Sequence, residues 1–270
     1  MRNFILFFLI LVITLSIATG GENRAYITLG KSIDVPDKTL SFENQAFEIT
    51  EIGNYKTNQE INFTVDAPGA DDMLIVLYDR DKLSTWYERV SNTGGHAVVV
   101  IPSNKTDKAG MYAITISHNR TIIGAVPVVI SDYDLAVNPG SKQIIAGNTL
   151  DVEVRISKNG VPINVNNTVK VVLAKGSSSF ETNATAVKTG VYEAHIKIPL
   201  AANGTFSLYS VITTERNVFI KYPETIGIER GGYIEIQPPA ERFPDEKAPF
   251  VGLAAAVAAL LGAALLRKRL

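Results

Sequence analysis

The chain has 270 residues, which is long enough for two ordinary domains once terminal targeting segments are set aside. It contains no cysteine, and this excludes disulfide bonds, thiolate metal sites and thiol chemistry. The 26 basic and 27 acidic side chains nearly balance; without the four basic residues of the two terminal segments (Arg2, Arg267, Lys268 and Arg269), 22 basic residues face 27 acidic ones. A mildly acidic protein of this kind has no electrostatic reason to bind nucleic acid.

The first 20 residues have the order of a secretory signal peptide. Arg2 precedes an uncharged apolar run from Phe4 to Ile17, and small residues follow that run. The run is 14 residues long, which is too short to span a bilayer comfortably. We therefore expect cleavage near Ala18 or Gly20, the alternative being an uncleaved N-terminal anchor.

The central part of the chain shows short strands and no sustained helical periodicity. Ile61, Phe63 and Val65 alternate with polar residues, which is the period of two expected of a half-buried strand. Asn- and Gly-containing turns separate the strand-like segments. Further β-branched or aromatic runs lie at 73–78, 96–101, 112–117, 125–131, 152–156, 169–174, 193–198, 206–212 and 233–237. This spacing predicts an all-β fold made of sandwiches.

A weak internal repeat refines the prediction. The segment 107–112, DKAGMY, is echoed by 188–192, KTGVY, and an alternating strand follows each copy. The first copy resembles the approach to strand F of immunoglobulin-like domains, where a Tyr hydroxyl bonds back to the main chain at a corner. The second copy lacks the Asp. The resemblance implies two tandem immunoglobulin-like β-sandwiches, at 22–131 and 132–237, of the cysteine-free kind found in prokaryotic surface proteins. We expect the first core to include Leu77, Trp86, Val99 and Ile114.

Six Asn-x-Thr triplets are candidate N-glycosylation sites. Each acceptor needs an exposed position in an exported chain, where a glycan adds bulk and solvation. The alternative interpretation is that Asn and Thr are simply common in turns and strands. The candidate acceptors are Asn62, Asn104, Asn119, Asn166, Asn183 and Asn203.

The sequence predicts a stalk and a membrane segment in the C-terminal part of the chain. Residues 238–248 are Pro-rich and polar, which is typical of an extended linker. Residues 249–266 carry no charge, and as a helix they would reach roughly 27 Å, barely the thickness of a hydrocarbon core. The basic residues Arg267, Lys268 and Arg269 at the end (267–270) are expected to stay cytoplasmic, leaving residues 21–248 outside the cytoplasmic membrane.

This tail also resembles the PGF-CTERM sorting signal of archaeal surface proteins. The resemblance rests on Pro249 and Phe250, the short Ala- and Leu-rich span and the terminal basic cluster. It implies that an archaeosortase processes the tail and that a prenyl-derived lipid holds the mature protein. Ala248 stands before Pro249 and Phe250, where the family has Pro-Gly-Phe. A permanent single-pass transmembrane helix gives the same topology, and a buried helix of a protein without an anchor is the third alternative.

The sequence offers no motif for catalysis or for a cofactor, and its three histidines are widely spaced. We therefore expect no enzyme, no cofactor and no catalytic, cofactor-binding or metal residues. Carboxylates do flank the strand at 73–78 and the step between the two sandwiches, and oxygen ligands of this kind suit calcium. The alternative is that these are turn aspartates that bond local amides. The carboxylates are Asp71, Asp72, Asp79, Asp81, Asp132 and Asp134.

The features combine into one functional hypothesis and one alternative. The first is a membrane-anchored cell-surface glycoprotein with a structural, envelope-associated (S-layer) or adhesive role, whose partners are the membrane and other surface proteins or glycans. The alternative is an extracellular accessory or solute-binding subunit of a transporter or surface enzyme. The second hypothesis predicts a concave, mostly apolar pocket with a few converging polar groups.

Overall fold

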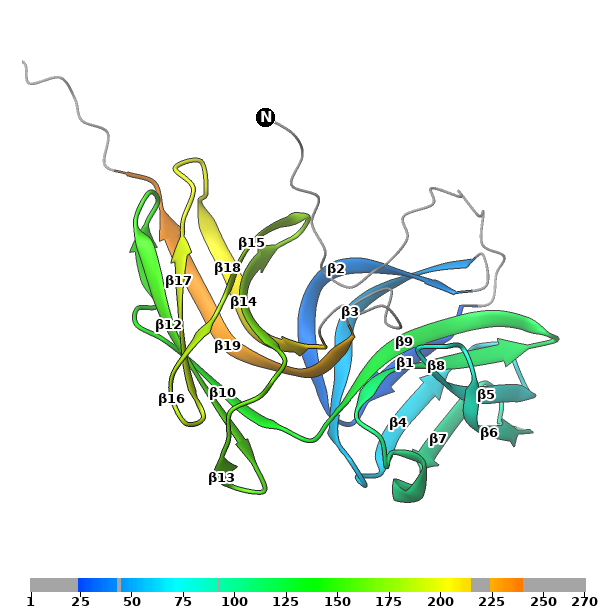
Figure 1. Cartoon of the computed structure of the whole chain (residues 1–270). Coiled ribbons are helices and arrows are strands. Elements are labelled where there is room, and N and C mark those ends of the chain that lie inside the picture. Colours follow the sequence, from blue (N-terminus) through cyan, green and yellow to red (C-terminus); the bar gives the residue numbers. More distant parts are fainter. Residues whose placement is uncertain (1–23, 43–44, 92, 215–223, 240–270) are drawn as a thin grey trace, which may run out of the picture. The chain divides into compact units, whose positions relative to one another are not determined.

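The computed structural model describes residues 24–42, 45–91, 93–214 and 224–239 (Figure 1). The described residues form strands throughout apart from one short 3₁₀ helix, so the predicted all-β class is confirmed. These strands belong to one compact unit that ends at Pro238. The predicted signal peptide (1–20), membrane segment (249–266) and basic cluster (267–270) lie outside the described residues. Within the described ranges, no helix is long and apolar enough to cross a membrane.

Two sheets form the first half of this unit. Sheet A has the order β1-β4-β7, and sheet B has the order β2-β3-β9-β8-β5-β6. All neighbouring strands are antiparallel except β3 and β9, which are parallel. The elements are β1 (Tyr26–Leu29), β2 (Ser32–Phe42), β3 (Gln45–Lys56), β4 (Ile61–Asp66), β5 (Met73–Asp79), β6 (Ser84–Val90), β7 (His96–Ile101), η1 (Ser103–Lys105), β8 (Gly110–His118) and β9 (Thr121–Ser131).

The second half repeats the two-sheet plan. Sheet C has the order β10-β12-β17-β16 with β13 beside β12, and sheet D has the order β11-β19-β18-β14-β15. Only β11 and β19 are parallel. The strands are β10 (Asp134–Pro139), β11 (Gln143–Ile145), β12 (Thr149–Lys158), β13 (Val161–Pro162), β14 (Thr168–Lys175), β15 (Ser178–Asn183), β16 (Thr185–Lys188), β17 (Val191–Lys197), β18 (Gly204–Thr213) and β19 (Thr225–Gln237). Strands β9 and β10 end and begin on either side of residues 132–133, at the polar step seen in the sequence.

Each pair of sheets encloses its own apolar core, because alternate residues of every strand point inwards. Sheets A and B share one cluster, in which Leu77, Val99 and Ile114 are almost completely buried. Trp86, on the edge strand β6, is only partly buried and packs against the margin of this cluster. Sheets C and D share a second cluster centred on β12, β14, β17 and β18.

A third apolar cluster joins the two sandwiches. It lies on the faces of sheets B and D that point away from their own cores, and we call it the seam. Its buried members are Ile33, Ile52, Val129, Val172, Ala174, Tyr209, Val211 and Ile228. As a result, ten of the eleven residues of β9 are buried, so this strand is covered on both faces.

Candidate functional site

The six candidate glycosylation sites are all exposed in the structure. Five of them lie at turns, loops or strand ends, and one lies inside a sheet. Asn62 is the second residue of β4, the middle strand of sheet A, where β1 and β7 flank it. Asn104 lies in η1, Asn119 in the β8–β9 turn, Asn166 in the loop between β13 and β14, Asn183 at the end of β15 and Asn203 directly before β18.

Local structure explains two of these positions. Asn119 has φ of 49°, a left-handed conformation that Asn tolerates better than most residues. In the Asn104 triplet, Thr106 is completely buried and its hydroxyl lies 2.7 Å from the carbonyl oxygen of Gln59. The buried Thr therefore ties η1 to the sandwich while Asn104 faces solvent.

The two tyrosines of the internal repeat both hold a turn of the main chain, in different ways. The Tyr112 hydroxyl donates to the carbonyl oxygen of Lys108 at 3.0 Å, four residues upstream, which confirms the predicted corner. The Tyr192 hydroxyl instead accepts a hydrogen bond from the amide of Val165 at 2.8 Å, 27 residues upstream. Burial raises the pKa of Tyr112, so the hydroxyl keeps its proton and remains a donor.

Two of the candidate calcium carboxylates, Asp132 and Asp134, are engaged by protein donors at the step between the sandwiches. Asp132 accepts hydrogen bonds from Thr57 Oγ1 at 2.7 Å and from Lys158 Nζ at 2.9 Å. Asp134 forms an ion pair with Lys56, with 2.8 Å between Oδ1 and Nζ. The bond from Thr57, followed by the bond and charge of Lys158, holds the pKa of Asp132 below its usual range. These contacts join the end of sandwich one to the start of sandwich two.

The other candidate carboxylates lie in turns or bends or, for Asp79, at the end of β5. Asp79 accepts hydrogen bonds from the amides of Asp81 and Leu83 at 3.0 and 2.9 Å, the local bonding expected of a turn aspartate. The main-chain oxygen of Asp72, and not its carboxylate, contacts His118 Nδ1 at 2.7 Å. Across the described ranges, the structure brings no three His, Asp or Glu side chains together in a way that could hold a metal ion.

Polar contacts surround the apolar seam. Tyr209 Oη donates to the carbonyl oxygen of Asp34 at 2.7 Å, and Arg230 pairs with the Asp34 carboxylate at 2.8 Å. Glu224 binds Arg80 at 2.8 Å and also accepts from the amide of Met111 at 2.9 Å. Burial raises the pKa of Tyr209, which keeps this hydroxyl a donor. Each contact joins a residue of sandwich one to a residue of sandwich two.

Two histidines form cross-strand pairs that the sequence did not reveal. His96 Nδ1 lies 2.6 Å from the Asp66 carboxylate across β7 and β4, and His195 Nδ1 lies 2.6 Å from Asp151 across β17 and β12. Both pairs are directly opposite in register and exposed. The partners are 30 and 44 residues apart, so only the strand register could have predicted them.

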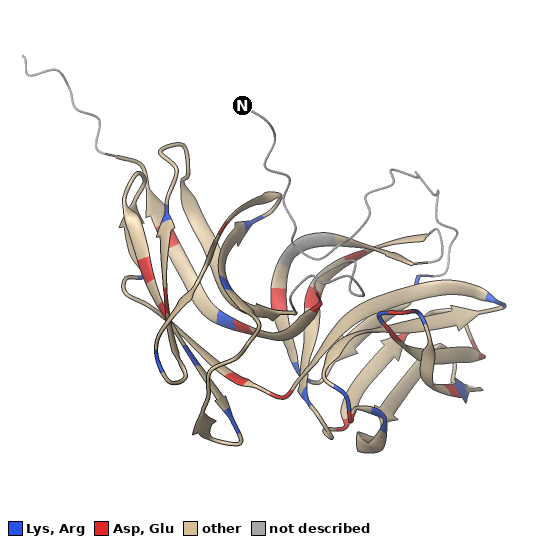
Figure 2. Ribbon diagram, in the orientation of Figure 1, with Lys and Arg blue, Asp and Glu red and all other residues tan. Residues whose placement is uncertain are grey.

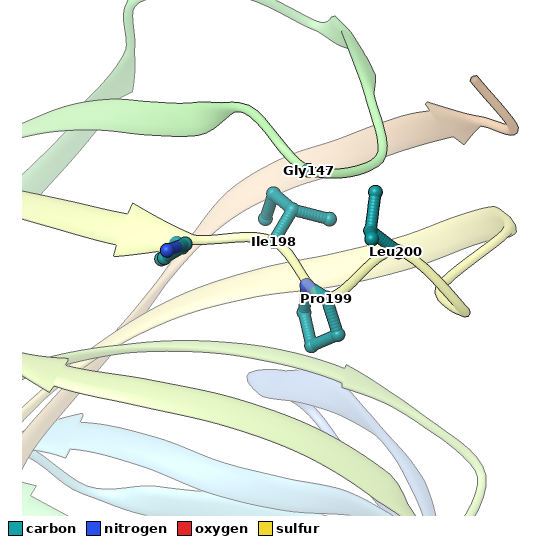
Figure 3. Close-up of a pocket in the computed structure, with 5 residues that line it drawn as sticks. Gly147, Ile198, Pro199 and Leu200 are labelled. Carbon is teal, nitrogen blue, oxygen red and sulfur yellow. The ribbon is translucent and has the colours of Figure 1, made fainter. Parts of the chain in front are cut away.

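One cavity of about 390 Å³ lies at an end of sandwich two. Gly147, Lys197, Ile198, Pro199 and Leu200 line it. Figure 3 shows the side chains of Ile198 and Leu200 pointing towards the loop that carries Gly147, whereas the Pro199 ring points the other way. Leu200 is 71% exposed, so the cavity is an open depression with one cationic group.

Charge is spread over the described surface without a large region of one sign (Figure 2). Nine ion pairs with a separation below 4 Å link acidic and basic side chains among the described residues, and two of these pairs involve His96 and His195.

No known protein family matches the chain, and no curated protein sequence is similar to it. Solved structures with a similar arrangement include FdeC, an Escherichia coli adhesin, with a TM-score of 0.28 and 10% identity, covering 80% of this chain and 65% of that one. The D0-D1 domain of intimin has a TM-score of 0.29 and 11% identity, covering 78% and 97%. A Salmonella alpha-2-macroglobulin has a TM-score of 0.30 and 9% identity, covering 82% and 15%. The similarity is distant and concerns the fold alone.

Proposed function

We propose that the chain is a non-enzymatic cell-surface glycoprotein with a structural, envelope-associated or adhesive role. In this proposal its two immunoglobulin-like sandwiches stand outside the cell as one body, and the segment after residue 238 holds them at the membrane. The partners are other surface proteins or glycans. The resemblance of the tail to archaeal sorting signals favours an archaeal envelope for this role.

The observation that carries the proposal is the placement of the six acceptor asparagines. They are distributed over both sandwiches, every one is exposed, and none belongs to the seam or to either core. Glycans on all six would therefore be compatible with the folded chain, as an exported glycoprotein requires. The seam supports the mechanical part, because an apolar interface with a polar rim keeps two domains from moving independently.

Intact mass and peptide mapping of the full chain, purified from the membrane of its native host, test the proposal. We expect the N-terminal peptide to be missing and hexose-containing additions on acceptor asparagines. Loss of the residues after Ala248 together with a lipid mass supports the sorting signal, and an intact peptide ending in Leu270 supports a permanent anchor. A chain that retains Met1 and carries no glycan at any acceptor contradicts the proposal.

The cavity at residues 147 and 197–200 favours the second candidate, a solute-binding accessory subunit. The depression has a volume of about 390 Å³, and Lys197 is the one charged residue among those that line it. Such a lining fits a small apolar molecule with an acidic group. Thermal shift measurements with medium-chain fatty acids check this: a rise in Tm that is lost in Lys197→Ala supports the candidate, and an unchanged Tm contradicts it.

A further inference from the structure

Strand β7 forms an unprotected edge of sheet A. It pairs with β4 on one side, and no strand of the described chain pairs with its other side (Figure 1). Its six residues, HAVVVI, include no Asp, Glu, Lys, Arg or Pro, and its pairing with β4 is regular, without a bulge. Natural edge strands usually carry a charged residue, a Pro or a bulge, because a flat apolar edge pairs readily with another chain.

The outward face of β7 begins with His96, which pairs with Asp66, and continues with two exposed valines. Val98 is 72% exposed and Val100 is 44% exposed, whereas Ala97, Val99 and Ile101 point into the core. The opposite edge of sheet A, β1, also lacks charged residues and Pro, but it has only four residues. Strand β6 carries Glu88 and Arg89, and β11 has only three residues.

Asn62 stands directly beside this apolar edge. It is the cross-strand partner of Val100, and Thr64 of the same acceptor triplet is the partner of Val98. Opposite residues of an antiparallel pair share a face with Cβ atoms about 5 Å apart, so Asn62 and both valines point to the same side of sheet A. The sheet is only three strands wide, with strands about 4.8 Å apart, so a group on its middle strand stands over both edges.

On the β1 side of Asn62 the neighbouring residue is Gly30, which has no side chain. The amide of Gly30, which continues β1, donates to the main-chain oxygen of Asn62 at 2.8 Å. A Cβ atom added at Gly30 would lie 2.9 Å from that oxygen and 3.6 Å from the Cβ of Asn62. The outer face of sheet A thus has an acceptor with open space on its β1 side and exposed valines on its β7 side.

We infer that a glycan on Asn62 covers Val98 and Val100 and keeps β7 from pairing with β7 of a second copy of this chain. The inference rests on the proposed export and glycosylation of the chain, and it gives one acceptor a role that the other five do not share. Asn183 provides the contrast. It also lies on an edge strand, but its cross-strand partner is Lys170, a charge that itself opposes pairing.

Sedimentation velocity of the glycosylated full chain tests the inference, with Asn62→Gln compared with the matched variant Asn183→Gln. Asn62→Gln is expected to raise the self-association constant by at least about ten-fold, since edge pairing would bury two valine side chains. Asn183→Gln is expected to leave it unchanged. Adding Val98→Lys to Asn62→Gln should restore the monomer, which separates edge pairing from misfolding, because an exposed charge on β7 does not refold a misfolded chain.

Four outcomes would overturn the inference. The first is that Asn62→Gln associates no more strongly than Asn183→Gln. The second is that adding Val98→Lys leaves the association of Asn62→Gln unchanged. Peptide mapping that finds Asn62 unmodified while the other acceptors are occupied removes the inference and leaves the proposed function standing. Mapping that finds all six acceptors unmodified removes both.

Discussion

If the seam couples the two sandwiches, a substitution in the seam should change the unfolding of both, and the fluorescence of the single tryptophan can measure this. Val172 lies on β14 in sandwich two and is completely buried, but it belongs to the seam, whereas its neighbours Val171 and Leu173 belong to the core of that sandwich. Val172→Ala removes two methyl groups. At about 0.8 kcal/mol each, the lost transfer free energy is roughly 1.6 kcal/mol, and the residual cavity brings the loss of unfolding free energy to about 2–3 kcal/mol.

Trp86 is the only tryptophan of the chain and lies in sandwich one. Its fluorescence during urea unfolding therefore reports sandwich one while the substitution is in sandwich two. If the seam couples them, Val172→Ala lowers the Trp86 midpoint by roughly 0.5–1 M urea, for an m-value of about 3 kcal/mol/M. The matched control is Val98→Ala, at an exposed position, which should change the free energy of unfolding by less than about 0.5 kcal/mol. A Trp86 midpoint that moves no more in Val172→Ala than in Val98→Ala would refute the coupling.

Three further substitutions test local features by urea unfolding. Tyr112→Phe removes the hydroxyl bond at the corner and is expected to lower the unfolding free energy by about 1 kcal/mol. Gly190→Ala should cost more than Gly160→Ala: both glycines have positive φ (72° and 76°), but an added Cβ at Gly190 lies 2.7 Å from a main-chain oxygen, and at Gly160 it meets nothing within 4 Å. Thr57→Val should lower the free energy of unfolding at neutral pH, because the bond from Thr57 is the main cause of the lowered pKa of Asp132. The difference in unfolding free energy from wild type should shrink as the pH falls below 3.8, the ordinary pKa of an Asp side chain, because acid then protonates the carboxylate and the stability from its lowered pKa is lost. A difference for Thr57→Val that is the same at pH 7 and pH 3 would contradict this assignment.

The half-buried strands could be predicted because their sequence carries the whole signal. Alternation at Ile61, Phe63 and Val65 is a local property of β4, and it requires no knowledge of the partner strand. The corner at Tyr112 could be predicted for the same reason, since its hydrogen-bond acceptor is only four residues away. Two strands without a continuous apolar or alternating run were missed: β2, which contains Pro36, and β6, which contains Glu88 and Arg89. Pro and Glu have low strand propensity, and pairing with neighbouring strands outweighs that preference.

The seam could not be predicted from alternation, although a signal was present. Residues 122–130, IIGAVPVVI, form an unbroken apolar run, and such a run is typical of a strand covered on both faces. Sequence alone does not say what covers the second face. The cross-strand pairs of His96 and His195 also could not be predicted from the sequence, because they depend on the register of strands that are distant along the chain. The edge status of β7 has the same origin, since a strand is an edge only by virtue of the order of the sheet.

The acceptor asparagines lie on exposed surface, whereas the seam buries part of the outer faces of sheets B and D. Sheets B and D turn their outer faces towards each other at the seam, and no acceptor is among the residues buried there. Asn183 shares the outer face of sheet D with its partner Lys170, but it lies exposed on the edge strand β15. Sheet A keeps its outer face in solvent, and it is the sheet that carries an acceptor within its middle strand. A glycan on a buried residue of the seam would force the two sandwiches apart, whereas a glycan on sheet A adds bulk where exposed valines stand on an uncovered edge strand. The same chain therefore covers apolar sheet surface in two ways: by packing one sandwich against the other, and, if Asn62 is modified as we infer, by a covalent polar layer that a second copy cannot displace.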